Sequence, residues 1–190
     1  MNIEINNIRK VFDDKVIFHE YSTVITAHRF TCVLGMSGCG KTTLLNLLMG
    51  LMQPDSGTIT GVPAKKSAVF QEDRLCEEFS AVANVRLVCQ KSVNPLDIEA
   101  HLKQIGLAGS LHIPVNQLSG GMRRRVAIVR AMLADSDIIF LDEPFKGLDA
   151  ETKQSVMAYV KANTLGKTVI MVTHDPEEVN MMNGETKYLL

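Results

Sequence analysis

Eight residues, Gly35–Thr42, are of the types and spacing that could hold a phosphate group. They read Gly-Met-Ser-Gly-Cys-Gly-Lys-Thr and match the pattern G-x-x-x-x-G-K-[ST] without a gap. The glycines let the backbone approach an anion closely, and the start of a following helix adds the positive end of its dipole. In this pattern Lys41 places a positive charge on the terminal phosphates, and Thr42 places a hydroxyl on Mg²⁺. The segment therefore predicts a phosphate-binding loop that works with magnesium.

Two adjacent carboxylates, Asp142 and Glu143, follow the apolar run Ile138–Leu141 and precede Pro144. A carboxylate at the carboxyl end of a buried strand lies where open α/β sheets bind ligands, so Asp142 is the expected partner of Mg²⁺. Because the strand is expected to end at Pro144, the side chain of Glu143 can turn toward the terminal phosphate and hold a water molecule there. Alone, the pair could equally be two solvated acids; beside Gly35–Thr42 it favours hydrolysis.

A third segment, Leu118–Met122, stands before a helix that we expect to begin near Arg123. Ser119 is a good N-cap residue, and Gly120 and Gly121 leave backbone N–H groups open to an anion. An ordinary helix start explains the same residues. Taken by itself, the segment therefore predicts a helix and leaves anion binding open.

The hydrophobic pattern predicts the elements that would position these residues. Short alternating apolar runs over 2–25, broken by a turn at 13–15, predict an antiparallel β lobe. Continuous apolar runs predict buried strands, and apolar residues at helical spacing predict helices. The expected strands are 30–34, 58–60, 67–70, 138–141 and 168–172, and the expected helices are 43–52, 82–89, 98–105, 123–133, 150–163 and 175–182.

The alternation of strands and helices indicates an α/β fold with a mainly parallel sheet covered on both faces. We expect one domain over residues 1–190. Within it, residues 1–71 and 133–190 would form the α/β core with the antiparallel β lobe. Residues 72–132 would form an inserted helical lobe.

Charge and composition argue against several classes of protein. The 190 residues include 20 Lys or Arg and 21 Asp or Glu, and 46% are hydrophobic. A nucleic-acid binder would show a clear basic excess, so no nucleic-acid partner is expected. The basic run Arg123–Arg125 is interpreted as a solvated helix face, with a contact to the neighbouring lobe as a further interpretation. Four irregularly spaced cysteines favour a reducing compartment over a disulfide framework or a zinc site.

The sequence also bears on membranes. It contains no run of about 20 apolar residues that could span a bilayer, and the first residues lack the pattern of a secretory signal. Any work at a membrane would therefore depend on a partner.

The three motifs, in this order, closely resemble those of the ATP-binding cassette ATPases, the nucleotide-binding subunits of ABC transporters, over essentially the whole chain. The resemblance implies a P-loop NTPase core of the RecA-like type that binds ATP and Mg²⁺ and hydrolyses ATP to ADP and phosphate. It also gives roles to isolated residues. Gln71 resembles the Q-loop glutamine and His174 the switch histidine at the γ-phosphate. Phe12 stands where the family places an aromatic residue on adenine, and Tyr21 is a poorer rival.

The resemblance sorts the candidate site residues by role. Those expected to be catalytic are Glu143, His174, Lys41 and Gln71. Those expected to bind ATP are Phe12, Gly35, Ser37, Gly38, Cys39, Gly40, Lys41, Thr42, Thr43, Ser119, Gly120 and Gly121. Those expected to hold Mg²⁺ are Thr42, Gln71 and Asp142. Leu118–Met122 resembles the family signature with Met122 in place of the usual glutamine, and Gly147–Asp149 resembles the D-loop.

Partners are implied in the same way. Two cassettes of this family pair head to tail, so ATP on Gly35–Thr42 of one subunit would be closed over by Leu118–Gly121 of an identical or paralogous subunit. Integral-membrane permease subunits and a solute-binding protein would complete the system, with the chain on the cytoplasmic face of the cell membrane. Since the sequence stops at Leu190, a regulatory C-terminal extension is not expected.

The transported solute is less defined by the sequence. The run Val69–Leu75 resembles that of importers for nitrate, aliphatic sulfonates and taurine. Exporters, lipoprotein-release cassettes and soluble ABC ATPases remain alternatives. The solute, the direction of transport and the permease stay open.

Overall fold

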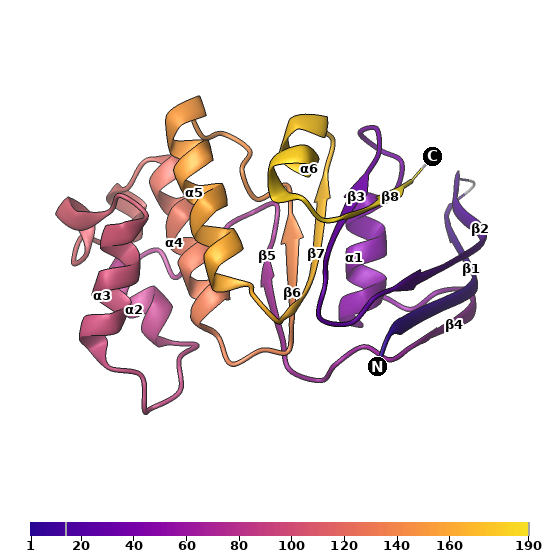
Figure 1. Cartoon of the computed structure of the whole chain (residues 1–190), viewed down its shortest axis with the longest axis horizontal. Helices are drawn as coiled ribbons and strands as arrows, with labels where there is room; N and C mark the ends of the chain where they lie inside the picture. The colour runs from indigo at the N-terminus through magenta and orange to yellow at the C-terminus, as the bar shows by residue number, and fades with distance from the viewer. Residues whose placement is uncertain (14, 190) are drawn as a thin grey trace.

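Two β-sheets organise the computed structural model, which describes residues 1–13 and 15–189 (Figure 1). An antiparallel sheet has the strand order β2-β1-β4 and consists of β1 (Ile3–Phe12), β2 (Lys15–Ile25) and β4 (Ser56–Thr60). A parallel sheet has the order β5-β6-β7-β3-β8. Its strands are β3 (Phe30–Leu34), β5 (Lys66–Val69), β6 (Ile138–Asp142), β7 (Thr168–Thr173) and β8 (Glu185–Tyr188).

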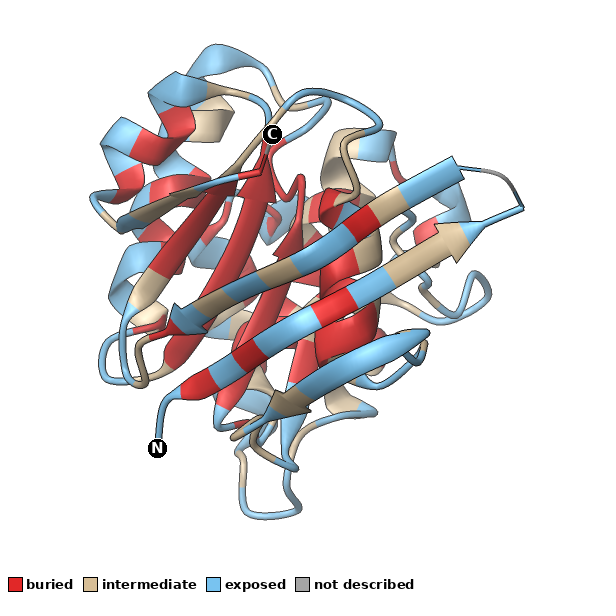
Figure 2. Ribbon diagram, turned by 90° about the vertical axis from the view of Figure 1, so that its right-hand side faces the viewer, coloured by how far each residue is buried: buried red, intermediate tan, exposed pale blue. Residues whose placement is uncertain are grey.

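Helix α1 (Lys41–Met49) lies between the two sheets, behind the antiparallel strands in Figure 2. Its buried leucines, such as Leu44 and Leu48, share one hydrophobic cluster with Ile5 of β1 and Phe140 of β6. A helix with an apolar face toward each sheet buries both, which accounts for the dense Leu repeat in this part of the sequence. The helix ends at Gly50, whose φ of 76° is favourable for glycine.

The remaining helices lie on the opposite side of the parallel sheet. They are α2 (Ala81–Arg86), α3 (Pro95–Gln104), α4 (Gly120–Leu133), α5 (Ala150–Asn163) and α6 (Pro176–Met182), with 3-10 turns at Ala108–Ser110 and Val115–Gln117. Helices α2 and α3 pack chiefly on each other and on α4. Figure 1 shows α2 and α3 grouped at one side of the molecule, beyond α4 and α5. Ile139 and Leu141 belong to the cluster under these helices, whereas Ile138 and Phe140 belong to the cluster around α1. Successive strand residues thus face opposite layers, so β6 is apolar at each of these positions.

The predicted fold class is confirmed: the large sheet is parallel, an antiparallel β lobe lies beside it, and helices cover both faces. The division at 72–132 stays a prediction. Strand 30–34 and helix 150–163 have the expected bounds, and most other elements agree within a few residues.

Two expected helices are present with shifted ends, the expected N-cap Ser119 is confirmed, and one strand lies outside the expected elements. The helix expected over 43–52 begins at Lys41 and ends at Met49, because the chain turns at Gly50. The helix expected from Arg123 begins at Gly120, because the Ser119 hydroxyl accepts a hydrogen bond from the Met122 N–H and so caps the helix three residues earlier. Strand β8 was not expected at all.

Helix length and hydropathy also bear on membrane insertion. Among the helices of the described residues, none combines the length and apolar character that a membrane span requires.

Candidate active site

The loop Gly35–Thr42 joins β3 to α1, as the phosphate-binding pattern requires. Gly40 precedes the first helical residue with a φ of 103°, and a Cβ there would lie 2.5 Å from Ile17 Cγ2. Gly38 has a φ of 81° and open space where a Cβ would stand. Side chains at these two positions would strain the backbone, so the glycines permit the wrapped loop that an anion needs.

Lys41 is held inside this loop. It is only 6% exposed, and its Nζ donates hydrogen bonds to the carbonyl oxygens of Gly35 at 2.7 Å and Met36 at 2.8 Å. These bonds fix the ammonium group at the start of α1, beside the backbone N–H groups of the loop. The positive charge is therefore already in the position where the pattern places a nucleotide's terminal phosphates.

Asp142 is the last residue of β6 and is 4% exposed. Burial raises the pKa of its carboxyl group and the charge of Glu143 adds to this, while a hydrogen bond from Thr42 and the charge of Lys41 oppose it. A carboxylate that is buried against the loop hydroxyl is a suitable ligand for a hard cation.

The site contains few other groups that could bind a metal. Within residues 1–13 and 15–189, no three His, Cys, Asp or Glu side chains are grouped as a metal cluster. Mg²⁺ is usually bound through one or two carboxylates together with the phosphates of its nucleotide. The single buried carboxylate of Asp142 and the hydroxyl of Thr42 fit that mode of binding.

Glu143 follows the strand with a φ of 44°, which turns its backbone out of the extended conformation. Its Oε1 lies 3.1 Å from His174 Nδ1 in a hydrogen bond. Its Oε2 is buried and accepts no hydrogen bond from the described residues, although Lys146 Nζ lies 3.4 Å away. Burial would raise the pKa of Glu143, but the hydrogen bond and charge of His174, together with Lys146, outweigh burial and lower it. The residue is thus held as a carboxylate whose second oxygen is buried and has no hydrogen-bond donor among the described residues.

One cavity of about 290 Å³ gathers much of the expected site. It is lined by Phe12, Ile17, Ser37, Gly38, Gly40, Lys41, Thr42, Thr43, Gln71, Glu143 and Lys146. Asp142 contacts this group through Thr42, and His174 contacts it through Glu143. Sheet order explains the convergence, because β5, β6, β7 and β3 are neighbours and their carboxyl ends share one edge.

The structure also distinguishes between the two aromatic candidates. Phe12 is 40% exposed and lines the cavity, whereas Tyr21 packs against Phe18 with their ring centroids 5.4 Å apart. Lys10 Nζ lies 5.5 Å from the centre of the Phe12 ring. The geometry therefore favours Phe12 as the residue that could stack on a base.

Several expected residues are not brought to this cavity. Cys39 Sγ lies against Gly35, and both residues line a separate, mostly apolar hollow of about 330 Å³ on another side of the loop. Ser119 and Gly120 are exposed and Gly121 is half-buried at the start of α4, and none of the three lines the cavity in this chain.

Lys146 was missed by the sequence analysis. It lies in the turn after Glu143, where its backbone N–H donates to the Glu143 carbonyl oxygen at 3.2 Å. A lysine three residues after a candidate catalytic acid was the available signal.

Of the expectations for Arg123–Arg125, the solvated face is wrong for Arg124, whereas the contact with the neighbouring lobe is found. Arg124 is 7% exposed and donates hydrogen bonds to the carbonyl oxygens of Phe70 and Gln71, both at 2.6 Å. Arg124 lies on the face of α4 that is directed toward β5 and the segment after it. The pattern of charges in the sequence does not reveal which face this is.

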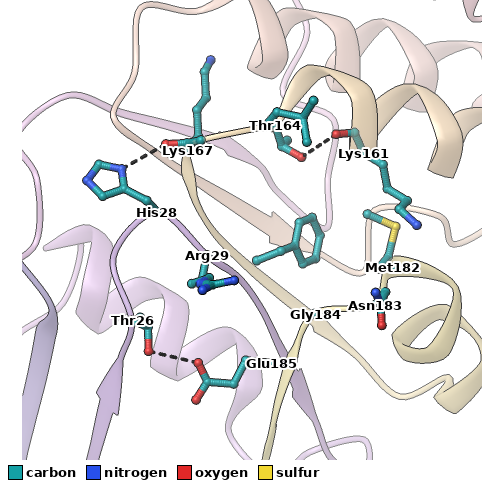
Figure 3. A pocket seen from close by; sticks show the side chains of 13 residues that line it. Thr26, His28, Arg29, Lys161, Thr164, Lys167, Met182, Asn183, Gly184 and Glu185 are labelled. Atoms are coloured by element: carbon teal, nitrogen blue, oxygen red, sulfur yellow. Dashed lines mark hydrogen bonds between the residues drawn. The ribbon is translucent and has the colours of Figure 1, made fainter.

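A larger cavity lies away from these residues, at the amino ends of β3 and β7 (Figure 3). It has a volume of about 570 Å³, but none of the described candidate site residues lines it. Several of its basic groups are already paired: Lys161 Nζ donates to Met181 O at 3.1 Å, and His28 Nδ1 lies 3.0 Å from Gly166 O. Cavity size is therefore a poor guide to the site in this protein.

A glycine loop at the carboxyl edge of a parallel sheet, with acids on a nearby strand, defines a P-loop nucleotide-hydrolysing protein. The family model described as ABC transporter matches residues 18–146. The taurine import ATP-binding protein TauB of Yersinia pestis bv. Antiqua (strain Antiqua) is 36% identical, over 96% of this chain and 77% of its own length. The spermidine/putrescine import ATP-binding protein PotA of Acetivibrio thermocellus is 34% identical, over 95% of this chain and 56% of its own length.

A solved structure agrees with these sequence matches. The dimeric post-hydrolysis state of the ATP-binding cassette MJ0796 bound to ADP and Pi is similar with a TM-score of 0.85 and 26% identity, over 98% of this chain and 94% of that one. The chain belongs to the ABC transporter family. It is an ATPase that binds ATP and hydrolyses it.

Proposed function

We propose that this chain is the ATP-binding subunit of an ABC importer, in which ATP hydrolysis drives a small solute through a membrane permease. The observation that carries the proposal is the convergence of Lys41, Thr42, Gln71 and Glu143 on one cavity at the carboxyl edge of the sheet. These four side chains supply the charge, the hydroxyl, the amide and the carboxylate that phosphoryl transfer to water requires.

Within the cavity each side chain has a distinct task. Lys41 and the loop N–H groups bind the phosphates, and Phe12 stacks on the adenine. Thr42, Gln71 and Asp142 would hold Mg²⁺, which neutralises charge on the phosphate oxygens when it is bound.

Glu143 and His174 handle the water. Glu143 lines the cavity, and its Oε2, which has no hydrogen-bond donor among the described residues, would accept a proton or a hydrogen bond from the attacking water. His174 holds the carboxylate through Oε1 and so restricts its orientation.

The second half of the site comes from a partner cassette in a head-to-tail dimer. What supports this is the position of Ser119, Gly120 and Gly121 at the start of α4, where the first two are exposed and none lines the chain's own cavity. A helix start with free N–H groups favours an anion and excludes water when it closes over one. The partner is an identical copy or a paralogue, and the similar MJ0796 cassette is described as dimeric.

Import and the membrane partner rest on the relatives. Both relatives described above are named as import ATP-binding proteins. We favour a taurine- or sulfonate-type solute because the run Val69–Leu75 resembles that of importers for such solutes. The subunit would bind permease subunits on the cytoplasmic face of the membrane and work with a solute-binding protein.

The ATPase and dimer parts of the proposal are tested with Glu143→Gln. This variant keeps the shape of the side chain but cannot act as a base, so the ATP-bound dimer should persist. Gel filtration of the variant with ATP and Mg²⁺ should show a dimer, while the wild type returns to monomer as ATP is consumed. Hydrolysis by the variant at the wild-type rate would contradict the role of Glu143.

Transport is tested separately by purification from membranes. A tagged chain should bring with it an integral-membrane permease, and vesicles containing that permease should accumulate taurine only when ATP is on the side of the cassette. Stable association with ribosomes or DNA instead would contradict a transport function.

A further inference from the structure

Helix α4 is attached to the segment that carries Gln71 through the side chain of Arg124. The two guanidinium nitrogens donate separately, Nη1 to the Phe70 carbonyl oxygen and Nη2 to the Gln71 carbonyl oxygen, each at 2.6 Å. Nη1 also lies 3.3 Å from Asp73 Oδ1. One planar side chain thus contacts three residues at the end of β5, and it holds the main chain of Gln71 directly.

These contacts are shielded from water. The side chain of Arg124 is 8% exposed and that of Asp73 is 20% exposed. Hydrogen bonds from a charged donor at low exposure are stronger than neutral ones, and the planar guanidinium loses little further freedom when both of its nitrogens are bound. Arg124 therefore fixes the position of the Gln71 backbone relative to α4.

The location of Arg124 on α4 gives this attachment a functional meaning. It lies five residues after Ser119, within the first turns of a helix whose start is the segment that would face the partner's nucleotide. A hydrogen-bonded helix behaves as a rigid rod over this length, with a rise of about 1.5 Å per residue. Gln71 lines the chain's own cavity. It is consequently attached to the helix whose start would face the nucleotide of the partner subunit.

We propose that Arg124 is a positioning residue for hydrolysis, which holds the main chain of Gln71 on α4 so that its amide is placed correctly in the cavity. The proposal rests on the proposed function, since Gln71 acts there on Mg²⁺ and water. Arg124 touches neither the nucleotide nor the reacting atoms. Its hydrogen bonds reach the site through the main chain of Gln71, and its positive charge also acts on Asp142.

The same helix supplies a matched control. Arg130 of α4 donates two hydrogen bonds to the same segment, to the carbonyl oxygens of Asp73 and Arg74, both at 2.8 Å. It resembles Arg124 in type, helix and number of backbone acceptors but does not contact Gln71. Loss of Arg130 would loosen the segment at Asp73 and Arg74. Loss of Arg124 would release the main chain of Gln71.

The test is a double-mutant cycle on the purified full chain. The turnover number is measured for wild type, Arg124→Gln, Arg130→Gln, Gln71→Ala and the double variant Arg124→Gln/Gln71→Ala. Affinity for a fluorescent ATP analogue and the melting temperature are measured on the same samples. These two readouts separate positioning from nucleotide binding and from folding.

We expect Arg124→Gln to lower the turnover number about 10- to 100-fold, because small displacements of a catalytic group have effects of this size. Affinity for the analogue should change less than about twofold, since the interaction lost is one that matters in the transition state. In the Gln71→Ala background the same substitution should cost less than about twofold, because residues that act through one another are not additive. Arg130→Gln should retain most of the turnover.

The inference is overturned if Arg130→Gln lowers turnover as much as Arg124→Gln does. It is also overturned if the losses from Arg124→Gln and Gln71→Ala multiply. If Arg124→Gln does not fold, Arg124→Lys takes its place in the cycle, because a single ammonium keeps the charge but cannot hold both carbonyls in the fork geometry. A wild type without Mg²⁺-dependent hydrolysis contradicts the proposed function, whereas an active wild type with additive variants contradicts only this inference.

Discussion

Glu143 has two nitrogen neighbours, and the structure ranks their importance for hydrolysis. His174 Nδ1 makes a hydrogen bond to Oε1 at 3.1 Å, while Lys146 Nζ lies 3.4 Å from Oε2 without a hydrogen bond, and the two side chains are similarly exposed. We therefore compare His174→Ala with Lys146→Met. The first removes the hydrogen bond that orients the carboxylate, and the second removes an ion pair that has no hydrogen bond.

The expected losses follow from the kind of contact. A hydrogen bond to a charged group contributes about 1.5–3 kcal/mol, so its complete loss from the transition state would slow turnover about 10- to 150-fold. An exposed ion pair contributes about 0–1 kcal/mol, which corresponds to at most about fivefold. His174→Ala should thus be clearly more harmful than Lys146→Met.

The assay is steady-state phosphate release at saturating ATP and Mg²⁺, with ATP affinity and melting temperature measured in parallel. Both neighbours contact the same carboxylate, so Glu143→Gln/His174→Ala should be hardly slower than Glu143→Gln alone. Equal losses for the two single variants would refute the ranking. A His174→Ala variant that binds ATP more weakly but turns over at the normal rate would refute the role of His174 in orienting Glu143.

Three further predictions concern the binding of adenine, the free energy of unfolding and the dependence of stability on pH. Phe12→Ala should weaken ATP binding about 2- to 10-fold, as expected for loss of one aromatic contact, whereas Tyr21→Ala should not; fluorescent-nucleotide titration decides between them. Asn84→Ala should lower the free energy of unfolding by about 2–4 kcal/mol, because the buried amide makes four hydrogen bonds to backbone groups of the preceding loop; a change below about 1 kcal/mol in urea denaturation would contradict this. A hydrogen bond from Lys153 holds the pKa of Asp175 below its ordinary value, so the unfolded chain takes up the proton first. The stabilisation is present above about pH 4 and is lost as pH falls further, and Asp175→Asn should show a smaller loss of stability between pH 6 and pH 3 than wild type.

Much of the fold could be predicted because its signals are local. The run Phe30–Leu34 is continuously apolar, and a strand of that composition must be buried on both faces. The glycines and the Lys-Thr pair of Gly35–Thr42 then specify both a turn and the start of α1. Local signals of this kind depend only on neighbours in the chain, so the sequence carries them completely.

Strand β8 could not be predicted because its signal is not local. Its sequence, Glu-Thr-Lys-Tyr, is short and mostly polar, and its residues are exposed or half-buried. It is a strand because the open edge of β3 supplies hydrogen-bond partners, with Cys32 paired to Thr186. Tertiary context overrides propensity in such a segment.

The candidate site divides in the same way. The types of its residues were evident from the sequence: a lysine and threonine in a glycine loop, two acids after a strand, and an isolated glutamine and histidine that the family resemblance singled out. Their convergence was decided by the strand order β5-β6-β7-β3, which brings the ends of segments more than a hundred residues apart to one edge. Whether Arg124 is solvated or buried, and whether Lys146 is near Glu143, was also decided there. Residue chemistry and local conformation are properties of the chain, but distances between distant residues exist only once the layers have packed.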